Sequence, residues 1–270
     1  MKTFVTFLPR ALVIFVIFMF FVMPFIVVAL SAFADQWSGT VLPSSYTFKW
    51  FVNLKPADWY ALRMSLYVAA EVAFLATAIS VWLALTIQSV GGKVGKVMDA
   101  LAMFPISVPS VVLGLAVLIT YSSRPFDLSS SWQIVVLGQT ALVLPFAYRI
   151  IAAGLQQEIT SLKDAAKTLG APPVMVLREV TLPMLGPAIR TSIAFTMAIS
   201  LGELGVTMMV YPPGFETVPI DVINKVNRGF YYDASSIALI LLAISLTVLT
   251  LIAYLRLDFW RGSKRRELAK

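Results

Sequence analysis

The chain has 270 residues, of which 59% are apolar and 13% are charged, and its formal net charge is +7. Soluble domains are closer to half apolar and one quarter charged, so this composition indicates a membrane protein. Cysteine and histidine are both absent, which argues against disulfides, zinc sites and histidine-based acid–base catalysis. The sequence also lacks a Gly-x-x-x-x-Gly-Lys-Ser/Thr phosphate loop, so any ATP that drives this protein is hydrolysed by another chain.

Long apolar runs account for the excess of apolar residues. A bilayer core about 30 Å thick needs roughly 20 apolar helical residues to cross it. None of the runs alternates as the strands of a membrane barrel do, so each predicts a helix. We therefore expect an all-α membrane protein with a single transmembrane domain over residues 1–270. Its six spans are predicted at about 11–32, 62–88, 97–121, 132–154, 187–210 and 235–257.

The first run has a second interpretation, as a cleaved secretory signal. Lys2 and Arg10 precede it, and Ala32-Phe33-Ala34 resembles a cleavage site. The run is about 22 residues long, however, which exceeds the 7–15 residues typical of a signal core. Pro24 also lies within it. Retention as the first span is therefore favoured.

The basic residues predict which way the spans point. Fifteen lysines and arginines fall in the two termini and the loops on one side, against six in the loops on the other side. Because cytoplasmic loops carry the excess of basic residues, both termini and the loop at about 155–186 are predicted to be cytoplasmic. The basic tail from Arg261 to Lys270 would attract anionic lipid at the inner leaflet.

This cytoplasmic loop contains signals for a short helix. Ser161 and Asp164 have the spacing of a capping box, which predicts the helix start there. Gly170 suits a left-handed residue that ends a helix, and Pro172-Pro173 prevents its continuation. The expected helix of about two turns has a small apolar face that needs cover. It would either seat in a groove of a partner protein or rest on lipid headgroups.

The loop also has a pattern in the order of its residues. Asp164-Ala165-Ala166 is followed after three residues by Gly170, then after nine residues by Val180, and then by Leu182-Pro183. This order resembles the EAA loop of ABC importer permeases. Asp164 stands where the family has Glu, and Val180 where it has Ile. In that family the loop binds the cytoplasmic ATPase subunit. The resemblance therefore implies an ATPase-coupling role for Asp164, Ala165, Ala166, Gly170, Leu182 and Pro183.

Segments of two predicted spans have further patterns. The third span opens with 104–114, FPISVPSVVLG, and the fifth contains 200–205, SLGELG, followed by 211–214, YPPG. These segments resemble one branch of these permeases, which serves sulfate, molybdate, ferric iron, thiamine, polyamines and phosphonates. This pattern most resembles the second permease of 2-aminoethylphosphonate importers. Thiamine, ferric iron and polyamines stay open as alternative solutes.

The resemblance also implies partners and a place in the cell. Such a subunit works in the bacterial inner membrane with two ATPase subunits, a second permease that is homologous or identical, and a periplasmic solute-binding protein. It is not an enzyme, and no cofactor or metal is expected.

Polar and helix-breaking residues inside the spans are candidates for the translocation pathway or its gate. Glu203 could meet the ammonium group of a solute, cap a helix end or bond a partner subunit. Gly202 beside it indicates a kinked or closely packed helix. Pro105 and Pro109 interrupt the third span, as in the broken helices that often mark transport sites. Glu71 could snorkel, pair with a neighbouring helix or line the pathway.

Two rival classes of function are less well supported. A transporter driven by an ion gradient predicts an internal repeat and ionisable relays at the membrane midplane, and the sequence shows no convincing repeat. A membrane-embedded enzyme needs a nucleophile, metal ligands or paired acids. Neither Glu71 nor Glu203, the two carboxylates inside the predicted spans, is accompanied by such residues.

Overall fold

The structure is a computed structural model that describes residues 2–125, 127–155 and 157–254. The chain divides into two compact units. Unit 1 comprises Met1–Leu62 and Thr217–Ile244, and unit 2 comprises Arg63–Glu216 and Ser245–Lys270. The division cuts two long helices, so each of these contributes residues to both units.

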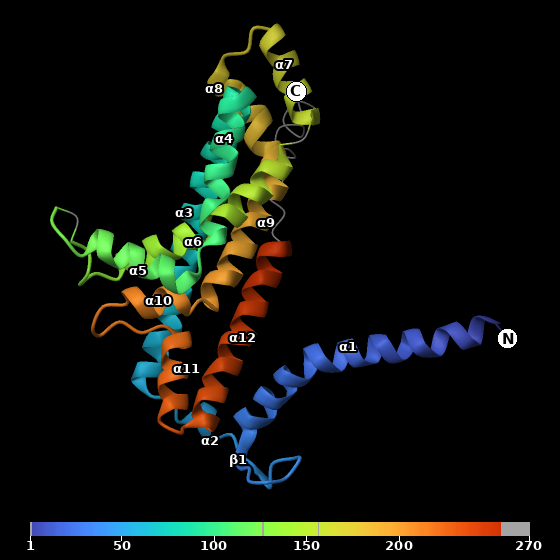
Figure 1. Cartoon of the computed structure of the whole chain (residues 1–270), viewed down its shortest axis with the longest axis vertical. Coiled ribbons are helices and arrows are strands. Elements are labelled where there is room, and N and C mark those ends of the chain that lie inside the picture. Colours follow the sequence, from blue (N-terminus) through green and yellow to red (C-terminus); the bar gives the residue numbers. More distant parts are fainter. Residues whose placement is uncertain (1, 126, 156, 255–270) are drawn as a thin grey trace, which may run out of the picture. The chain divides into compact units, whose positions relative to one another are not determined.

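Unit 1 contains one long N-terminal helix, a small two-stranded sheet and several further helical segments (Figure 1). Its strands β1 and β2 are antiparallel, and Ala34 is paired with Tyr46. In chain order its elements are α1 (Lys2–Phe33), β1 (Ala34–Gln36), β2 (Ser45–Tyr46), α2 (Lys49–Val52), the start of α3 (Pro56–Val90), α11 (Val218–Asn227) and the first part of α12 (Tyr231–Tyr254).

Helix α1 is apolar and largely uncovered. Its candidate span, Phe15–Phe33, has a mean hydropathy of 2.7 and is only 6% buried. An uncovered apolar helix of this length is expected when lipid or a partner helix supplies the surroundings. The predicted first span at 11–32 therefore lies in α1.

Aromatic side chains hold the sheet of unit 1 in place. The Trp50 indole N–H donates to the Ala34 carbonyl over 2.7 Å. The Trp37 backbone N–H donates to the Tyr232 hydroxyl over 2.8 Å, and that hydroxyl donates to the Trp37 carbonyl over 3.2 Å. Satisfying the backbone in this way fixes a hairpin that is too short to be stable alone.

The regular elements of unit 2 among its described residues are all helices (Figure 1). Its elements are the rest of α3, α4 (Gly92–Met103), the 3₁₀ turn η1 (Phe104–Ser107), α5 (Ser110–Tyr121), α6 (Gln133–Gly154), α7 (Gln157–Thr168), α8 (Pro173–Met175), the π-helical turn η2 (Val176–Thr181), α9 (Leu182–Leu201), α10 (Gly205–Val210) and the end of α12.

The core of unit 2 forms around α6. Ile134, Val135 and Val143 of this helix are wholly buried. They pack with Val72 of α3 and Val206 of α10. These are small or β-branched side chains, which allow close contact between helices in lipid, where dispersion rather than water exclusion drives helix association.

The long apolar helices of the structure agree with most of the six predicted spans. Among the described residues, five helices are long and apolar enough to cross a membrane, or six if one bent pair is counted as a span. The predicted spans at 62–88 and 132–154 lie in α3 and α6. The span at 235–257 lies in α12 as far as Tyr254, and its last residues fall outside the described ones. The all-α membrane class is confirmed.

The third predicted span, 97–121, is broken, as its two prolines predicted. Helix α4 with η1 meets α5 at a bend of 104°. Proline disfavours the helical conformation of the residue before it, and Val108 before Pro109 is extended, with φ −96° and ψ 127°. Pro105 is the second residue of the 3₁₀ turn, which follows directly after the last residue of α4, Met103. Two prolines therefore turn the chain here rather than kink it slightly.

The fifth predicted span, 187–210, is placed wrongly. The continuous helical segment runs from Pro173 to Leu201, and α10 follows as a separate short helix. The apolar residues of α10 extend the hydropathy signal beyond the real helix end at Gly202. The polar loop predicted at 155–186 is accordingly mostly helical, because it holds α7, α8, η2 and the start of α9.

Candidate functional site

Helix α7 forms the first half of the segment that resembles a coupling loop. It has 12 residues and begins at Gln157, so the capping box predicted at Ser161 and Asp164 is wrong. Glutamine and glutamate cost little in a helix, which lets the helix extend a turn upstream of Ser161. Asp164 instead pairs with Lys167 over 3.5 Å on an exposed surface. Such a pair contributes little stability.

The end of α7 has the predicted glycine geometry. Gly170 adopts φ +81°, so the expected left-handed conformation is confirmed. The Gly170 N–H donates to the Lys167 carbonyl over 2.9 Å, and the Ala171 N–H donates to the Ala166 carbonyl over 3.0 Å. These two bonds form a Schellman motif, which satisfies helix-end carbonyls and reverses the chain. The backbone, rather than crowding, demands glycine here, because an added Cβ would have no neighbour within 4 Å.

The second half of the segment returns along α8 and η2 to α9. Helix α7 packs against η2, and Lys163 donates to Gln88 of α3 over 3.1 Å. Figure 1 shows α7 and α8 at the end of unit 2 where α4 begins. Leu182 and Pro183 form the first turn of α9, as the N-terminal position of a proline allows. All six residues predicted to couple an ATPase thus lie in one helix–turn–helix segment.

Exposed apolar side chains surround this turn. Four residues, which we call the α7–α8 surface, are each at least 46% exposed: Leu162, Leu169, Val174 and Met175. Leu169 at the helix end is 88% exposed. A short helix with uncovered apolar side chains needs a partner surface, whether protein or lipid.

Glu203 lies in the break between α9 and α10 and is 7% exposed. Its Oε1 accepts the Val206 N–H over 2.7 Å, and its Oε2 accepts the Thr207 N–H over 3.0 Å and the Thr207 hydroxyl over 2.6 Å. The carboxylate therefore caps α10, which is one of the alternatives considered for it. Carboxylates are favoured at helix N-termini because they bind the free N–H groups.

A chain of neutral hydrogen bonds continues from Glu203 into α6. The Gln139 amide donates to the Thr207 hydroxyl over 2.8 Å and accepts from the Ser200 hydroxyl. Sequence reasoning missed this link because it searched the spans for ionisable groups only. A lone glutamine inside an apolar run was the available signal, since a buried amide in lipid needs partners.

The structure brings the two helix breaks together. Gly205 at the start of α10 packs against Ser110 at the start of α5, directly after Pro109. A Cβ added to Gly205 would overlap the Ser110 Oγ and lie 3.1 Å from the Ser110 Cβ. The break at Pro105–Pro109 therefore lies beside the break at Gly202–Glu203, although about 100 residues separate them. Glu71 is elsewhere on α3 and interacts with Tyr67, one helical turn earlier.

Unit 1 contains a buried ion cluster that the sequence did not reveal. The Lys225 ammonium lies 2.7 Å from Asp58, 3.0 Å from Asp221 and 3.2 Å from Asp233. Burial lowers the pKa of Lys225, but hydrogen bonds to Asp58 and Asp221 raise it more, so its pKa is above the ordinary value of 10.5. The i,i+4 spacing of Asp221 and Lys225 was visible in the sequence. Asp58 was not, because it is 167 residues away along the chain.

Comparisons with known proteins agree with this architecture. A protein of Salmonella choleraesuis (strain SC-B67) with the provisional name 2-aminoethylphosphonate transport system permease protein PhnV is 34% identical over 94% of each chain. The spermidine/putrescine transport system permease protein PotC of Escherichia coli (strain K12) is 23% identical over 86% of each chain.

Solved structures give the fold. Two crystal structures of a bacterial alginate ABC transporter match with TM-scores of 0.76 and 0.74, at 17% identity. They cover 94% and 96% of this chain, and 95% and 96% of the matched chains. The second of them contains an alginate-bound periplasmic protein.

The family model for the binding-protein-dependent transport system inner membrane component matches residues 76–261. The matched residues include α7 with its glycine turn, both helix breaks and most of the spans. The protein is therefore a multi-pass inner-membrane subunit of an ABC importer, with a transport role rather than an enzymatic one. The chain belongs to the family of binding-protein-dependent transport system inner membrane components.

Proposed function

We propose that this chain is a permease subunit of an importer for 2-aminoethylphosphonate. The observation that carries the proposal is the match to the relative named for that solute, which extends over nearly the full length of both chains. The residues 200–205 and 211–214, which resemble the same group, include the Glu203 cap. Spermidine or putrescine is the second candidate, because the polyamine permease matches more distantly.

The α7 segment would couple this subunit to an ATPase. Asp164, Ala165 and Ala166 lie in α7, and Gly170 ends it in a fixed reversal. The α7–α8 surface offers exposed apolar side chains, which a groove of the ATPase would cover. Leu182 and Pro183 begin α9, so a push on α7 would pass through η2 into a transmembrane helix. Rigid-body movement of this kind is an established way to switch between two states.

The partners proposed are two ATPase subunits, a second permease and a periplasmic binding protein. Both termini and α7 would lie in the cytoplasm, as the distribution of basic residues predicts. The gate would lie where the two helix breaks meet, with Pro105, Pro109, Gly202 and Glu203 around it. Broken helices that carry polar groups are typical of transport pathways.

Replacing Gly170 tests the coupling role. Gly170→Val places a β-branched residue at φ +81°, which costs about 1–3 kcal/mol of strain. The strain lowers the population of the reversed loop conformation relative to other conformations, and each 1.4 kcal/mol changes that ratio tenfold. We therefore expect ATP-driven uptake in proteoliposomes to fall about tenfold. Gly170→Asn is the matched control, because asparagine tolerates this conformation. Normal uptake by the valine variant would remove Gly170 from the coupling role.

The solute is tested with the complete complex in lipid. ATP hydrolysis by the co-purified ATPase is measured with the binding protein and either 2-aminoethylphosphonate or spermidine. Stimulation by 2-aminoethylphosphonate alone is the expected result. Stimulation by spermidine alone would replace the proposed solute and keep the family, whereas failure of any ATPase to co-purify would contradict the coupling proposal.

A further inference from the structure

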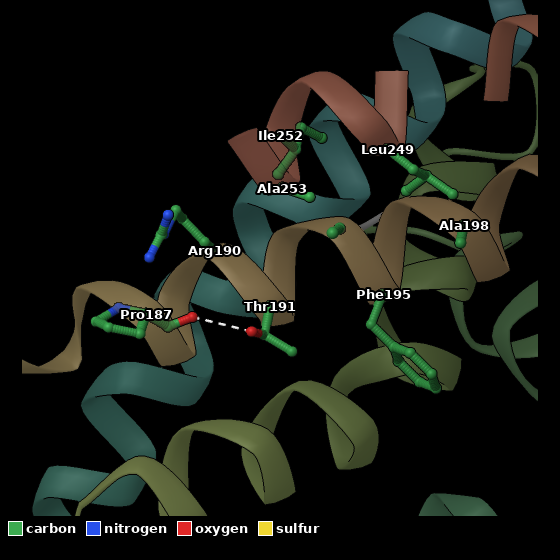
Figure 2. Close-up of a pocket in the computed structure, with 9 residues that line it drawn as sticks. Pro187, Arg190, Thr191, Phe195, Ala198, Leu249, Ile252 and Ala253 are labelled. Atoms are coloured by element: carbon green, nitrogen blue, oxygen red, sulfur yellow. Dashed lines mark hydrogen bonds between the residues drawn. The ribbon is translucent and has the colours of Figure 1, made fainter. Parts of the chain in front are cut away.

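A groove runs between α9 and the end of α12 within unit 2. Its volume is about 490 Å³. Figure 2 shows Ala198 and Leu249 at one end of it, and Arg190, Ile252 and Ala253 at the other. None of the polar networks described above uses this groove.

The two ends of the groove differ in chemistry. Arg190 is the one charged residue among the described residues that line it. The Thr191 hydroxyl donates to the Pro187 carbonyl over 3.0 Å, so this lining hydroxyl is already used as a donor (Figure 2). Beyond them the lining is apolar, through Ala194, Phe195 and Ala198 to Leu249. A cation at one end of an apolar groove complements an amphiphile with an anionic head.

The charged end of the groove lies toward the predicted cytoplasmic side. Arg190 is in the first half of α9, which begins at Leu182. On the other wall, Ile252 precedes the predicted cytoplasmic edge at residue 257 by five residues. Ala198 lies about 12 Å farther along α9, at 1.5 Å per residue. The groove thus extends from its charged end farther into the membrane.

We propose that this groove binds an anionic phospholipid of the inner leaflet. The lipid phosphate would accept charge-assisted hydrogen bonds from the Arg190 guanidinium, and an acyl chain would lie along Ala194 and Ala198. Basic pockets between transmembrane helices on the cytoplasmic side suit such headgroups. Arg190 also interacts within the chain, but a guanidinium has five N–H donors and can serve both partners.

Other occupants fit the groove less well. An arginine that faces acyl chains without an anion costs about 2.5–3.5 kcal/mol or more. A second permease packed on the groove would have to bury the same charge against protein. A small zwitterionic phosphonate supplies an anion for Arg190, but it has no apolar tail for the rest of the groove. The lipid satisfies both ends.

Lipid crosslinking tests the proposal on the complete transporter complex in nanodiscs. Photoactivatable phosphatidylglycerol or phosphatidylcholine is included, and crosslinked peptides are mapped by mass spectrometry. We expect phosphatidylglycerol adducts on residues 187–198 and 249–253 in excess over phosphatidylcholine adducts. Arg190→Gln should reduce this excess about fivefold, since a basic residue near the membrane surface contributes about 1 kcal/mol. Arg190→Lys should retain most of it.

Arg149→Gln is the matched control. Arg149 is exposed on α6 on the same predicted side of the membrane and does not line the groove. Ala194→Trp fills the apolar part without changing charge, so it should reduce adducts even if Arg190→Gln prevents assembly on gel filtration.

Three results would overturn the proposal. Equal adducts from the two lipids, or an equal loss in Arg149→Gln, would show that Arg190 selects no anion. Crosslinks from the groove to the companion permease in place of lipid would show that protein covers it. Displacement of the phosphatidylglycerol adducts by 2-aminoethylphosphonate would assign the site to the solute.

Discussion

Unit 1 buries an ammonium group among three carboxylates, whereas unit 2 buries one carboxylate among neutral donors. The Lys225 cluster joins α11 to the starts of α3 and α12, and its bond to Asp58 spans 167 residues of sequence. The Glu203 cap is satisfied within four residues along the chain, and Gln139 adds neutral links.

The two networks differ in the energetic cost of removing one of their residues. In the ion cluster, removal of the cation leaves uncompensated charge away from water, which is expensive. In the neutral network, removal of one member leaves an unpaired dipole, and hydrogen bonds between membrane helices contribute only about 0.6 kcal/mol on average. Unit 1 should therefore depend on its network far more than unit 2 does.

The largest effect is expected from Lys225→Met. This change leaves Asp58, Asp221 and Asp233 without their shared cation and should lower the free energy of unfolding by about 3–5 kcal/mol. Thermal unfolding of the purified complex measures it. Lys55→Met is the control, because that ammonium is 67% exposed and 4.0 Å from Asp233, and its loss should cost less than about 1 kcal/mol. Equal effects of the two variants would contradict the comparison.

Gly205→Ala should have the next largest effect. The added methyl group overlaps Ser110 where the two helix breaks meet, and overpacking costs about 1–3 kcal/mol. Ser110→Gly removes the opposing side chain, so the double variant should recover most of the loss in thermal stability and uptake. A double variant no better than the single one would show that the breaks are not in contact.

Gln139→Leu tests the neutral hydrogen-bond network of unit 2. It removes the amide between Ser200 and Thr207 but leaves the Glu203 cap, so a loss of about 1 kcal/mol is expected. Gln133→Leu is the matched control on the same helix, at an exposed position. Should Gln139→Leu equal Lys225→Met in its effect on thermal unfolding, the neutral network would be as important as the ionic one.

The smallest effect concerns pH. Because the pKa of Lys225 is raised above 10.5, its contribution to stability is complete below that pH and is lost as the pH rises through the folded-state pKa. The difference in melting temperature between the native protein and Lys225→Met should thus be constant near about pH 8 and shrink above about pH 10.5. A difference that stayed constant above that range would exclude the ammonium as its source.

Sequence reasoning succeeded where the signal is local. Apolar runs located α3, α6 and α12, and the glycine followed by two prolines located the end of α7. It anticipated the break at Pro105 and Pro109 but not its angle of 104°, and it failed where continuous hydropathy hides the helix end after Leu201. Leu201 and Val206 are both apolar, and the carboxylate of Glu203, which lies between their helices, caps the second one.

The candidate site divides in the same way. Asp164, Gly170 and Pro183 occur at fixed spacing within one segment, so pattern alone selects them. The neighbourhood of Ser110 and Gly205, and the contact of Asp58 with Lys225, depend on packing between distant segments. No local pattern specifies such contacts.

ATP-dependent uptake tests the central claim most directly. The complete complex is reconstituted in proteoliposomes with binding protein outside and ATP inside, and accumulation of labelled 2-aminoethylphosphonate is followed. The account predicts accumulation that requires ATP and the binding protein and that persists when ion gradients are dissipated. Accumulation driven by an ion gradient without ATP would contradict it.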